Sequence, residues 1–432
     1  MAGQSEREVT GATGPFGLPA HPLRPNVLGE VHSRPFHLVE TPRIILQLAF
    51  LKEGADFTDD LAMLGSLARS RGASGPEPDA PHFASDWGRG QLRWERHSEF
   101  STWRWDGPAE CGFDEPCRDH PFGSTFRAPG LLISALRLDL RQPAEGEAAL
   151  RRFDETSLCY STMAGGSARG ATDFRQDSDG LTRILVIDDG LGPARAGALT
   201  QRLTEIETYR TLALLGLPAA QAVSPAIRRI ESDLLAITSR LGSATELGSE
   251  ALLDAIIALA SELEAGAVAS LYRFGASRAY AEIVNQRLLV IGEQPIPGHE
   301  TWGAFLLRRM GPAMRTCQSV EQRQADLSEK LARAANLLRT RVDVELERQN
   351  QTLLESMDRR ARLQLRLQQT VEGLSVAAVS YYVLGLIRYL AEGAAAAGAA
   401  IEPGVATALA VVPVVLGIWW LVRRIRRTHV ER

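Results

Sequence analysis

The feature that most constrains the fold of this 432-residue chain is a pair of apolar segments near its C-terminus. They read LSVAAVSYYVLGLIRYLA (374–391) and GVATALAVVPVVLGIWWLV (404–422). Each is close to the roughly 20 residues that a helix needs to cross about 30 Å of hydrocarbon. Arginine-rich stretches flank the outer ends, at 359–366 and 423–427, whereas the loop between the segments has no basic residue. Because short arginine-rich loops stay in the cytoplasm, these segments predict a transmembrane hairpin at 374–422 with both chain ends inside.

A buried hairpin in a large soluble protein is the alternative for two Ala-rich helices of this length. The flanking arginines favour the membrane, as do Trp419 and Trp420, which would lie at interface depth. The first twenty residues contain no apolar signal segment, which fits an N-terminus that remains in the cytoplasm. Residues 423–432 then form a basic cytoplasmic tail.

The first half of the chain has the pattern of a sheet-containing domain. IILQLAFL (44–51) is typical of a buried strand, and QLRWERHSEFSTWRW (91–105) alternates with period two. Further strands are expected at 130–140, 157–164, 170–176 and 181–188, with 158–176 forming a hairpin. We therefore expect a disordered tail at 1–25 and a cytoplasmic α+β domain with a largely antiparallel sheet at 26–190.

After Gly190 the apolar pattern becomes helical, and 191–311 is expected to be a helical region. Predicted helices cover 194–216, which ends at Gly216, then 224–242, which opens with Ser224 and Pro225, and 249–288. A short helix should end at Gly311, and a long stalk helix should start at Pro312 and reach residue 373.

A helix as long as the stalk must pack on something. Four apolar residues of the stalk form a seam with the spacing of a coiled coil: Leu327, Leu331, Ala334 and Leu338. Two partners fit this seam, namely the earlier helices of the same chain and the same helix of neighbouring subunits.

Two polar clusters are candidate functional sites. The first, in GEVHSRPF, comprises Glu30, His32 and Arg34, and the second, in RWERHSEF, comprises Glu95, Arg96, His97 and Glu99. On a strand, Glu95, His97 and Glu99 share one face and Arg96 projects from the other. Such a face could bind a divalent cation or act as acid and base. The alternatives are a solvated strand face and an ion-pair network that joins 30–34 to 95–99.

The other motifs give weaker evidence for a functional site. The group Cys111, Asp114, Cys117, Asp119 and His120 holds possible metal ligands, but its spacing is not a standard zinc spacing, and a polar turn is the better interpretation. No catalytic constellation stands out, so we predict neither an enzyme nor a resident cofactor. The formal net charge of −4 argues against a general nucleic-acid binder.

The first apolar segment also has a candidate packing face. Gly373, Ala377, Tyr381 and Gly385 have i,i+4 spacing and share one side of a helix. We expect this face to contact the first span of another subunit in a homo-oligomer, or to line a pore. The alternative is that it packs only on the second span of its own chain.

Several motifs together resemble the bacterial DUF3422 family of membrane-anchored proteins: GEVHSRPF, RWERHSEFSTWRW, GLTRILVIDDGL, QRLTEIETYRTLALLGLP, RFGASRAYAEIVNQRL and ERQNQTLLESMDRRARLQLRLQQTVEGLSVAAVSYYVLGLIRYL. The resemblance covers about 26–428. It implies two C-terminal spans in the bacterial inner membrane and no established activity. The long helix running into its apolar segment is also similar to eukaryotic mitochondrial proteins involved in sporulation and translation.

The layout is distantly similar to CorA-type magnesium channels, which have a cytoplasmic α/β domain, a long stalk helix and two spans. Their Gly-Met-Asn motif is absent, because the equivalent stretch reads GLIRYLAEG (385–393). Two hypotheses follow. The chain is a CorA-like homo-oligomer that transports or senses divalent cations, or it is a non-conducting membrane-anchored scaffold that binds a cytoplasmic partner.

Overall fold

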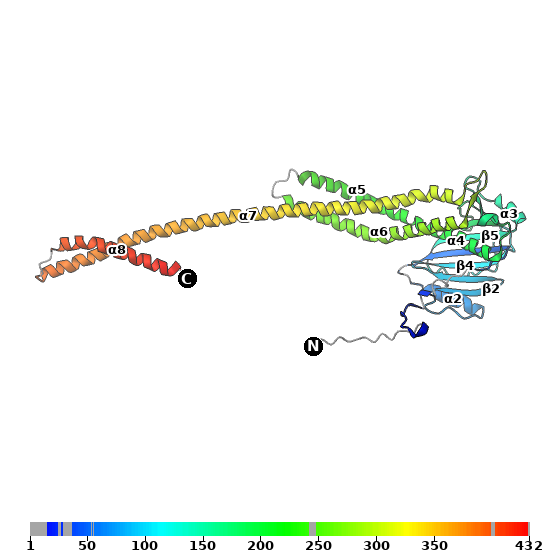
Figure 1. Ribbon diagram of the computed structural model, residues 1–432, viewed down its shortest axis with the longest axis horizontal. Helices are drawn as coiled ribbons and strands as arrows, with labels where there is room; N and C mark the ends of the chain where they lie inside the picture. Colours follow the sequence, from blue (N-terminus) through cyan, green and yellow to red (C-terminus); the bar gives the residue numbers. More distant parts are fainter. Residues whose placement is uncertain are drawn as a thin grey trace. The chain divides into compact units, whose positions relative to one another are not determined.

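The structure, a computed structural model, describes residues 15–24, 27–28, 37–52, 54, 56–241, 248–398 and 402–430. The chain divides into two compact units, Met1–Ser239 with Ala255–Arg333, and Arg240–Asp254 with Ala334–Arg432. The first unit holds the sheet and the helices packed on it, and the second holds the later part of α7 (Trp302–Ala396) together with α8 (Pro403–Val430) (Figure 1).

The described part of the first unit contains a nine-stranded sheet of order β2-β3-β4-β1-β5-β8-β7-β6-β9. Its strands are β1 (Arg43–Leu51), β2 (His82–Trp87), β3 (Gly90–Arg96), β4 (Phe100–Pro108), β5 (Leu131–Arg141), β6 (Cys159–Met163), β7 (Ala168–Thr172), β8 (Thr182–Asp188) and β9 (Gln294–Pro295). All neighbours pair antiparallel except β5 and β8. The predicted α+β fold with a largely antiparallel sheet is confirmed, as is the β6–β7 hairpin.

The two faces of the sheet pack on different helices because strand side chains alternate. On one face, Ile45 and Ala49 of β1 join the core formed with α4 (Pro193–Leu214), α6 (Ser249–Ile291) and the first turns of α7 (Trp302–Ala396). On the other face, Phe50 packs with Trp94, Trp103 and α2 (Thr58–Ser70). A short helix, α3 (Pro143–Leu150), lies against β8.

Helix α5 (Gly216–Leu241) runs alongside α6 and α7 as a bundle (Figure 1). Ion pairs tie the three together within the first unit, with Arg229 on Glu262 and Arg323 on Glu231 at 2.6 Å. The polar pair Ser270 and Gln324 adds a buried hydrogen bond between α6 and α7.

Two predicted helix boundaries are wrong. Helix α5 starts at Gly216 and runs through Pro225, and the Ser224 hydroxyl donates to the Ala220 carbonyl from inside the helix instead of capping its start. The apolar face of α5 continues across this point, since Ala220 and Ile227 are both buried. Burial of that face offsets the loss that a proline causes in a helix.

The boundary at Gly311 and Pro312 is also wrong, because α7 is one continuous helix of 95 residues. Proline lacks the N–H that would donate to the carbonyl of Arg308, at a cost of about 3 kcal/mol. Met310 on one side and Ala313 and Cys317 on the other are buried on the same helix face. Packing on both sides therefore carries the helix across the proline.

The seam of the stalk is buried within a single chain. Leu327 and Leu331 are 2% and 0% exposed, and Ala334 and Leu338 are buried as well. Of the two partners considered above, helices of the same chain suffice to cover the seam. Beyond it the apolar side chains of α7 are exposed, as at Leu353 and Met357.

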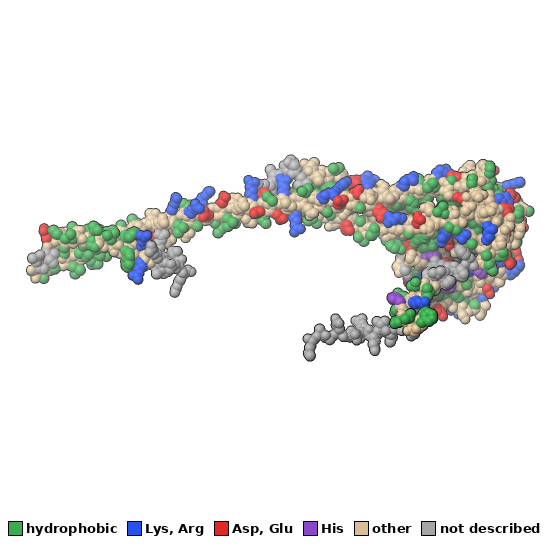
Figure 2. All heavy atoms as spheres, in the orientation of Figure 1, with side chains coloured by type: hydrophobic (Ala, Val, Ile, Leu, Met, Phe, Trp, Pro, Cys, Tyr) green, Lys and Arg blue, Asp and Glu red, His purple; other side chains and the backbone are tan. Residues whose placement is uncertain are grey.

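The second unit ends in two apolar helices. The stalk continues through the first apolar segment to Ala396, and α8 (Pro403–Val430) follows after a short connection and turns back (Figure 1). Both helices are long and apolar enough to cross a membrane, and their most apolar stretches are only 6% and 0% buried. Figure 2 shows mostly hydrophobic side chains over this part, whereas charged ones mark the stalk. A core helix of a soluble protein would be largely covered by its own chain.

Candidate functional site

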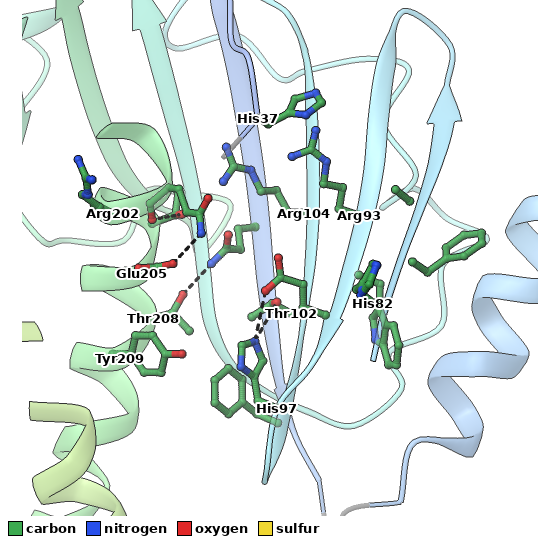
Figure 3. A pocket seen from close by; sticks show the side chains of 18 of the residues that line it. His37, His82, Arg93, His97, Thr102, Arg104, Arg202, Glu205, Thr208 and Tyr209 are labelled. Carbon is green, nitrogen blue, oxygen red and sulfur yellow. Dashed lines mark hydrogen bonds and ion pairs between the residues drawn. The ribbon is translucent and has the colours of Figure 1, made fainter. Parts of the chain in front are cut away.

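The first unit contains a cleft of about 660 Å³ between α4 and the β2–β3–β4 end of the sheet (Figure 3). Strand β1 lies in its floor, and Arg287 and Val290 of α6 close one side. A volume of this size suits a small organic molecule. The lining contains four arginines, three histidines and two glutamates, so positive charge prevails: His37, His82, Arg93, Glu95, His97, Arg104, Arg202, Glu205 and Arg287.

The alternation of β3 and β4 explains why polar groups face this cleft. Trp94 and Trp103 turn toward α2, where both indoles donate at 2.9 Å to the buried carboxylate of Asp60. Their sequence neighbours Arg93 and Arg104 therefore project from the opposite face, into the cleft.

Arg93 and Arg104 are directly opposite each other in the register of β3 and β4. Like charges in such a cross-strand pair destabilise a sheet. The charge of one carboxylate, Asp106, stabilises both guanidinium groups. Its Oδ1 lies 3.9 Å from Arg93, while its Oδ2 accepts two hydrogen bonds from Arg43 at 2.8 and 3.1 Å. A single buried carboxylate thus faces three guanidinium groups.

Arg104 is the least satisfied of these three. Its one hydrogen bond in the described structure, to the Thr200 hydroxyl, is 3.5 Å long, and its buried Nε has no hydrogen-bond partner there. Burial lowers the pKa of Arg104, although Asp106 and Glu95 offset part of the effect. The Arg104 guanidinium therefore has more N–H donors than acceptors among the described residues.

His37 lies beside the two arginines at the same end of the cleft (Figure 3). Burial lowers the pKa of His37, and the charge of Arg93 lowers it further. The backbone here is fixed because Val39 donates to the Pro193 carbonyl, and a side chain at Gly197 would collide with the carbonyl of His37.

The other end of the cleft combines aromatic and polar side chains. The His97 ring stacks on Phe100 with centroids 4.1 Å apart, and its Nε2 lies 3.3 Å from the Thr102 hydroxyl and 4.0 Å from Glu95. Tyr209 of α4 meets the His97 ring edge-on at 6.5 Å.

Glu99, predicted to share a strand face with Glu95 and His97, lies elsewhere. Strand β3 ends at Arg96, and Glu99 sits in the following turn, where Arg273 donates two hydrogen bonds at 2.7 and 3.0 Å and the Tyr280 hydroxyl donates one at 2.8 Å. Burial alone would raise the pKa of Glu99, but these donors outweigh it and lower the pKa. Glu99 joins the sheet to α6 and is not available to a cation.

The remaining predicted residues are placed as follows. Arg96 projects to the other face, as expected, and its guanidinium lies 4.6 Å from the Phe57 ring centre. Glu30, His32 and Arg34 lie outside the described residues, so the proposed network joining 30–34 to 95–99 is untested. In the described part of the chain no three metal-ligating side chains converge.

The segment that holds Cys111 and Cys117 serves as a cover over β5. Three arginines of the sheet surround the fully buried Asp139, and they also donate to carbonyls of this segment: Arg137 to Gly112 at 2.9 Å, Arg141 to Cys111 at 2.7 Å, and Arg183 to Phe113. The two sulfur atoms are 3.4 Å apart, and burial raises the pKa of Cys117 to about 12. This matches a structural turn better than a metal site.

The candidate packing face of the first span is open on its own chain. An added Cβ at Gly373 or at Gly385 would meet no atom of another described residue within 4 Å, and Tyr381 is 76% exposed. Ala377 is exposed as well. The expected contact with another subunit stays a prediction.

Sequence reasoning missed Arg93 and Arg104. The signal was available in RWERHSEFSTWRW, because an arginine that alternates with buried tryptophans on two adjacent strands must face away from them. The sequence pattern does not reveal the register of β3 and β4, which places the two arginines opposite each other.

A family model described as "Protein of unknown function (DUF3422)" matches residues 19–429. The resemblance noted from the motifs is thereby confirmed. Searches of curated proteins and of solved structures gave no match, so the similarity of layout to CorA-type channels gains no support.

Proposed function

Since the chain belongs to the DUF3422 family, whose description names no activity, we propose a function from its own residues: it is a membrane-anchored, non-conducting protein that binds a small polar molecule in the cleft. The hairpin of the second unit serves as the anchor. The first unit works on the cytoplasmic side of a bacterial inner membrane.

The cleft supports binding as the function. It combines a volume of about 660 Å³ with convergent polar side chains, including the unsatisfied Nε of Arg104. A binding pocket typically shows a few polar groups without full partners in an otherwise packed site. The unsatisfied Nε of Arg104 inside this cleft is the observation that most favours a bound ligand.

A tryptophan in place of Ala84 tests the proposal. Ala84 lines the cleft and is directly opposite Arg93 in the β2–β3 register, so an indole there fills the space beside the arginines. We expect a small molecule to copurify with the full chain in detergent, detected by native mass spectrometry, and to be lost from Ala84→Trp.

The matched control is Arg89→Trp, in the exposed turn of the same hairpin and outside the cleft lining. This variant should retain the bound molecule. Equal occupancy in both variants would refute binding in this cleft.

We also propose that the protein is a homo-oligomer whose first spans meet along Gly373, Ala377, Tyr381 and Gly385. Support comes from the open space at both glycines, where an added Cβ would meet nothing within 4 Å from the part of the chain that the structure describes. Helices in membranes associate through small residues because close backbone approach improves packing.

A cysteine at Ala377 should therefore crosslink between subunits in membranes, whereas one at Val379, on a different side of the same helix, should crosslink poorly. Equal crosslinking at both positions would contradict an interface on this face.

One feature favours transport or sensing of a divalent cation, namely the order of a globular domain, a long helix and two apolar helices along the chain. A cleft with more arginines than carboxylates repels a cation such as Mg²⁺. For this reason we prefer the binding protein over the channel.

A further inference from the structure

The cleft's polar end has the features of a site for a negatively charged group. Arg93 and Arg104 point to the same end, next to His37, as Figure 3 shows. Guanidinium groups bind phosphate and carboxylate oxygens through paired N–H donors. The question is whether the protein itself already satisfies these donors.

The described residues offer too few acceptors for the N–H donors of Arg93 and Arg104. Arg93 donates twice to Gln91 Oε1, at 2.6 and 2.9 Å, so its partner within hydrogen-bonding distance is a neutral amide. Asp106 is engaged by Arg43 through Oδ2, and its Oδ1 is buried without a hydrogen bond in the described structure. Among the described residues, Arg104 has one hydrogen bond, the 3.5 Å contact with Thr200.

The other carboxylates of the cleft act on the two arginines through their charge but supply no hydrogen-bond acceptor to them in the described residues. Glu205 is paired with Arg287 and accepts a hydrogen bond from Gln201 at 2.9 Å. Glu95 lies toward His97, at 4.0 Å. The polar end of the cleft therefore keeps two opposed guanidinium groups, directly across two strands, with a net positive charge.

Resting on the proposed binding function, we infer that the ligand carries a doubly charged oxyanion group, a phosphoryl or dicarboxylate group, which lies between Arg93 and Arg104. The anion converts the unfavourable cross-strand pair into a clamp. The rest of the ligand occupies the space toward Phe100 and Tyr209, because a phosphate alone is far smaller than a cavity of about 660 Å³.

The stability of the ligand-free protein separates this role from a structural one. A structural arginine is needed whether or not an anion is present, and its loss destabilises the fold. If Arg104 serves the ligand, Arg104→Gln should unfold at the same or a higher temperature in chloride buffer, because a like-charge pair is relieved.

The test uses the full chain in detergent, at constant ionic strength, with orthophosphate and succinate as separate probes in thermal unfolding and calorimetry. We expect saturable stabilisation of the unmodified protein by one probe, which identifies the group. Arg104→Gln should weaken that binding by about tenfold to a hundredfold, as expected for one charged hydrogen-bonding partner. Arg93→Gln should do the same, and Arg89→Gln, in the exposed turn, should have no effect.

Three results would overturn the inference: no saturable effect of either probe, unchanged affinity in both arginine variants, or a loss of stability of Arg104→Gln in chloride. These results are distinct from failure of the proposed function. Suppose that the copurifying ligand is neutral or cationic, and that it is lost from Ala84→Trp but kept by Arg104→Gln. This result would support binding in the cleft and refute an anionic group on the ligand. A molecule retained equally by Ala84→Trp and Arg89→Trp would remove the binding function itself.

Discussion

Replacing Asp139 by asparagine should lower the free energy of unfolding of the globular unit by about 3–5 kcal/mol, the usual cost of removing one partner of a buried ion pair. Asp139 is fully buried and accepts hydrogen bonds from Arg137 at 2.9 Å, Arg141 at 2.7 Å and Arg183 at 3.1 Å. The neutral amide leaves these guanidinium groups without their shared counter-charge. Urea unfolding followed by tryptophan fluorescence, on the protein in detergent, measures the change.

The loss should also free the covering segment, because the same arginines hold its carbonyls. The thiol of Cys111 should then react faster with a soluble thiol reagent than it does in the unmodified protein. Since a typical domain is stable by only about 5–15 kcal/mol, the variant should be close to the limit of folding.

Asp114→Asn provides the control within the same segment. Asp114 pairs with Arg152 at 2.8 Å, a distance like those around Asp139, but the two side chains are 52% and 65% exposed. Water screens such a pair, and its contribution to stability is small. Similar effects of the two substitutions would contradict the role of burial.

The regular elements with strong patterns were predictable from the sequence. The period-two run at 91–105 predicted β3 and β4, the apolar runs at 44–51 and 130–140 predicted β1 and β5, and apolar length predicted the two exposed helices at the C-terminus. Strand β2 was missed because both of its faces mix polar and apolar residues, with His82, Ala84 and Asp86 exposed and Phe83, Ser85 and Trp87 half-buried. Strand β9 is only two residues long and owes its place to pairing with β6.

The predicted helix ends were wrong where tertiary packing outweighed the local start and stop signals. The stop predicted near Gly216 is confirmed, because α4 ends at Leu214 and α5 begins at Gly216. By contrast, Pro225, Gly311 and Pro312 are ordinary stop or start signals, yet all three lie within helices of the structure. A continuous buried face on both sides of each one outweighed the local cost. Such faces are visible only when the partner helices are known.

The candidate site was predicted in part. Glu95 and His97 do line the cleft, whereas Glu99 is drawn away by Arg273 and Tyr280, two residues more than 170 positions later in the chain. The missing members, Arg93, Arg104 and His37, come together through strand register and through the crossing of residue 37 over α4. A linear pattern does not contain that information.

The second large effect concerns topology. If 374–391 and 404–422 span the inner membrane with arginines on the cytoplasmic side, a cysteine at Ala397 lies on the outer side of that membrane. Moving the arginine clusters across the bilayer would cost about 2.5–3.5 kcal/mol for each residue at the centre of the span. Labelling at 397 should therefore be close to all or none. A cysteine at Val412, in the middle of the second span, should stay unlabelled even in opened cells, because water-soluble reagents do not reach the hydrocarbon.

Labelling of intact cells with a membrane-impermeant maleimide is the most direct test of a membrane-anchored protein with a cytoplasmic binding unit. The unmodified chain, whose cysteines are Cys111, Cys117, Cys159 and Cys317, gives the background. We expect Ala397→Cys to be labelled on intact cells and a cysteine added after Arg432 to be labelled only once the cells are opened. Labelling of the C-terminal cysteine on intact cells, or of position 397 only in opened cells, would contradict it.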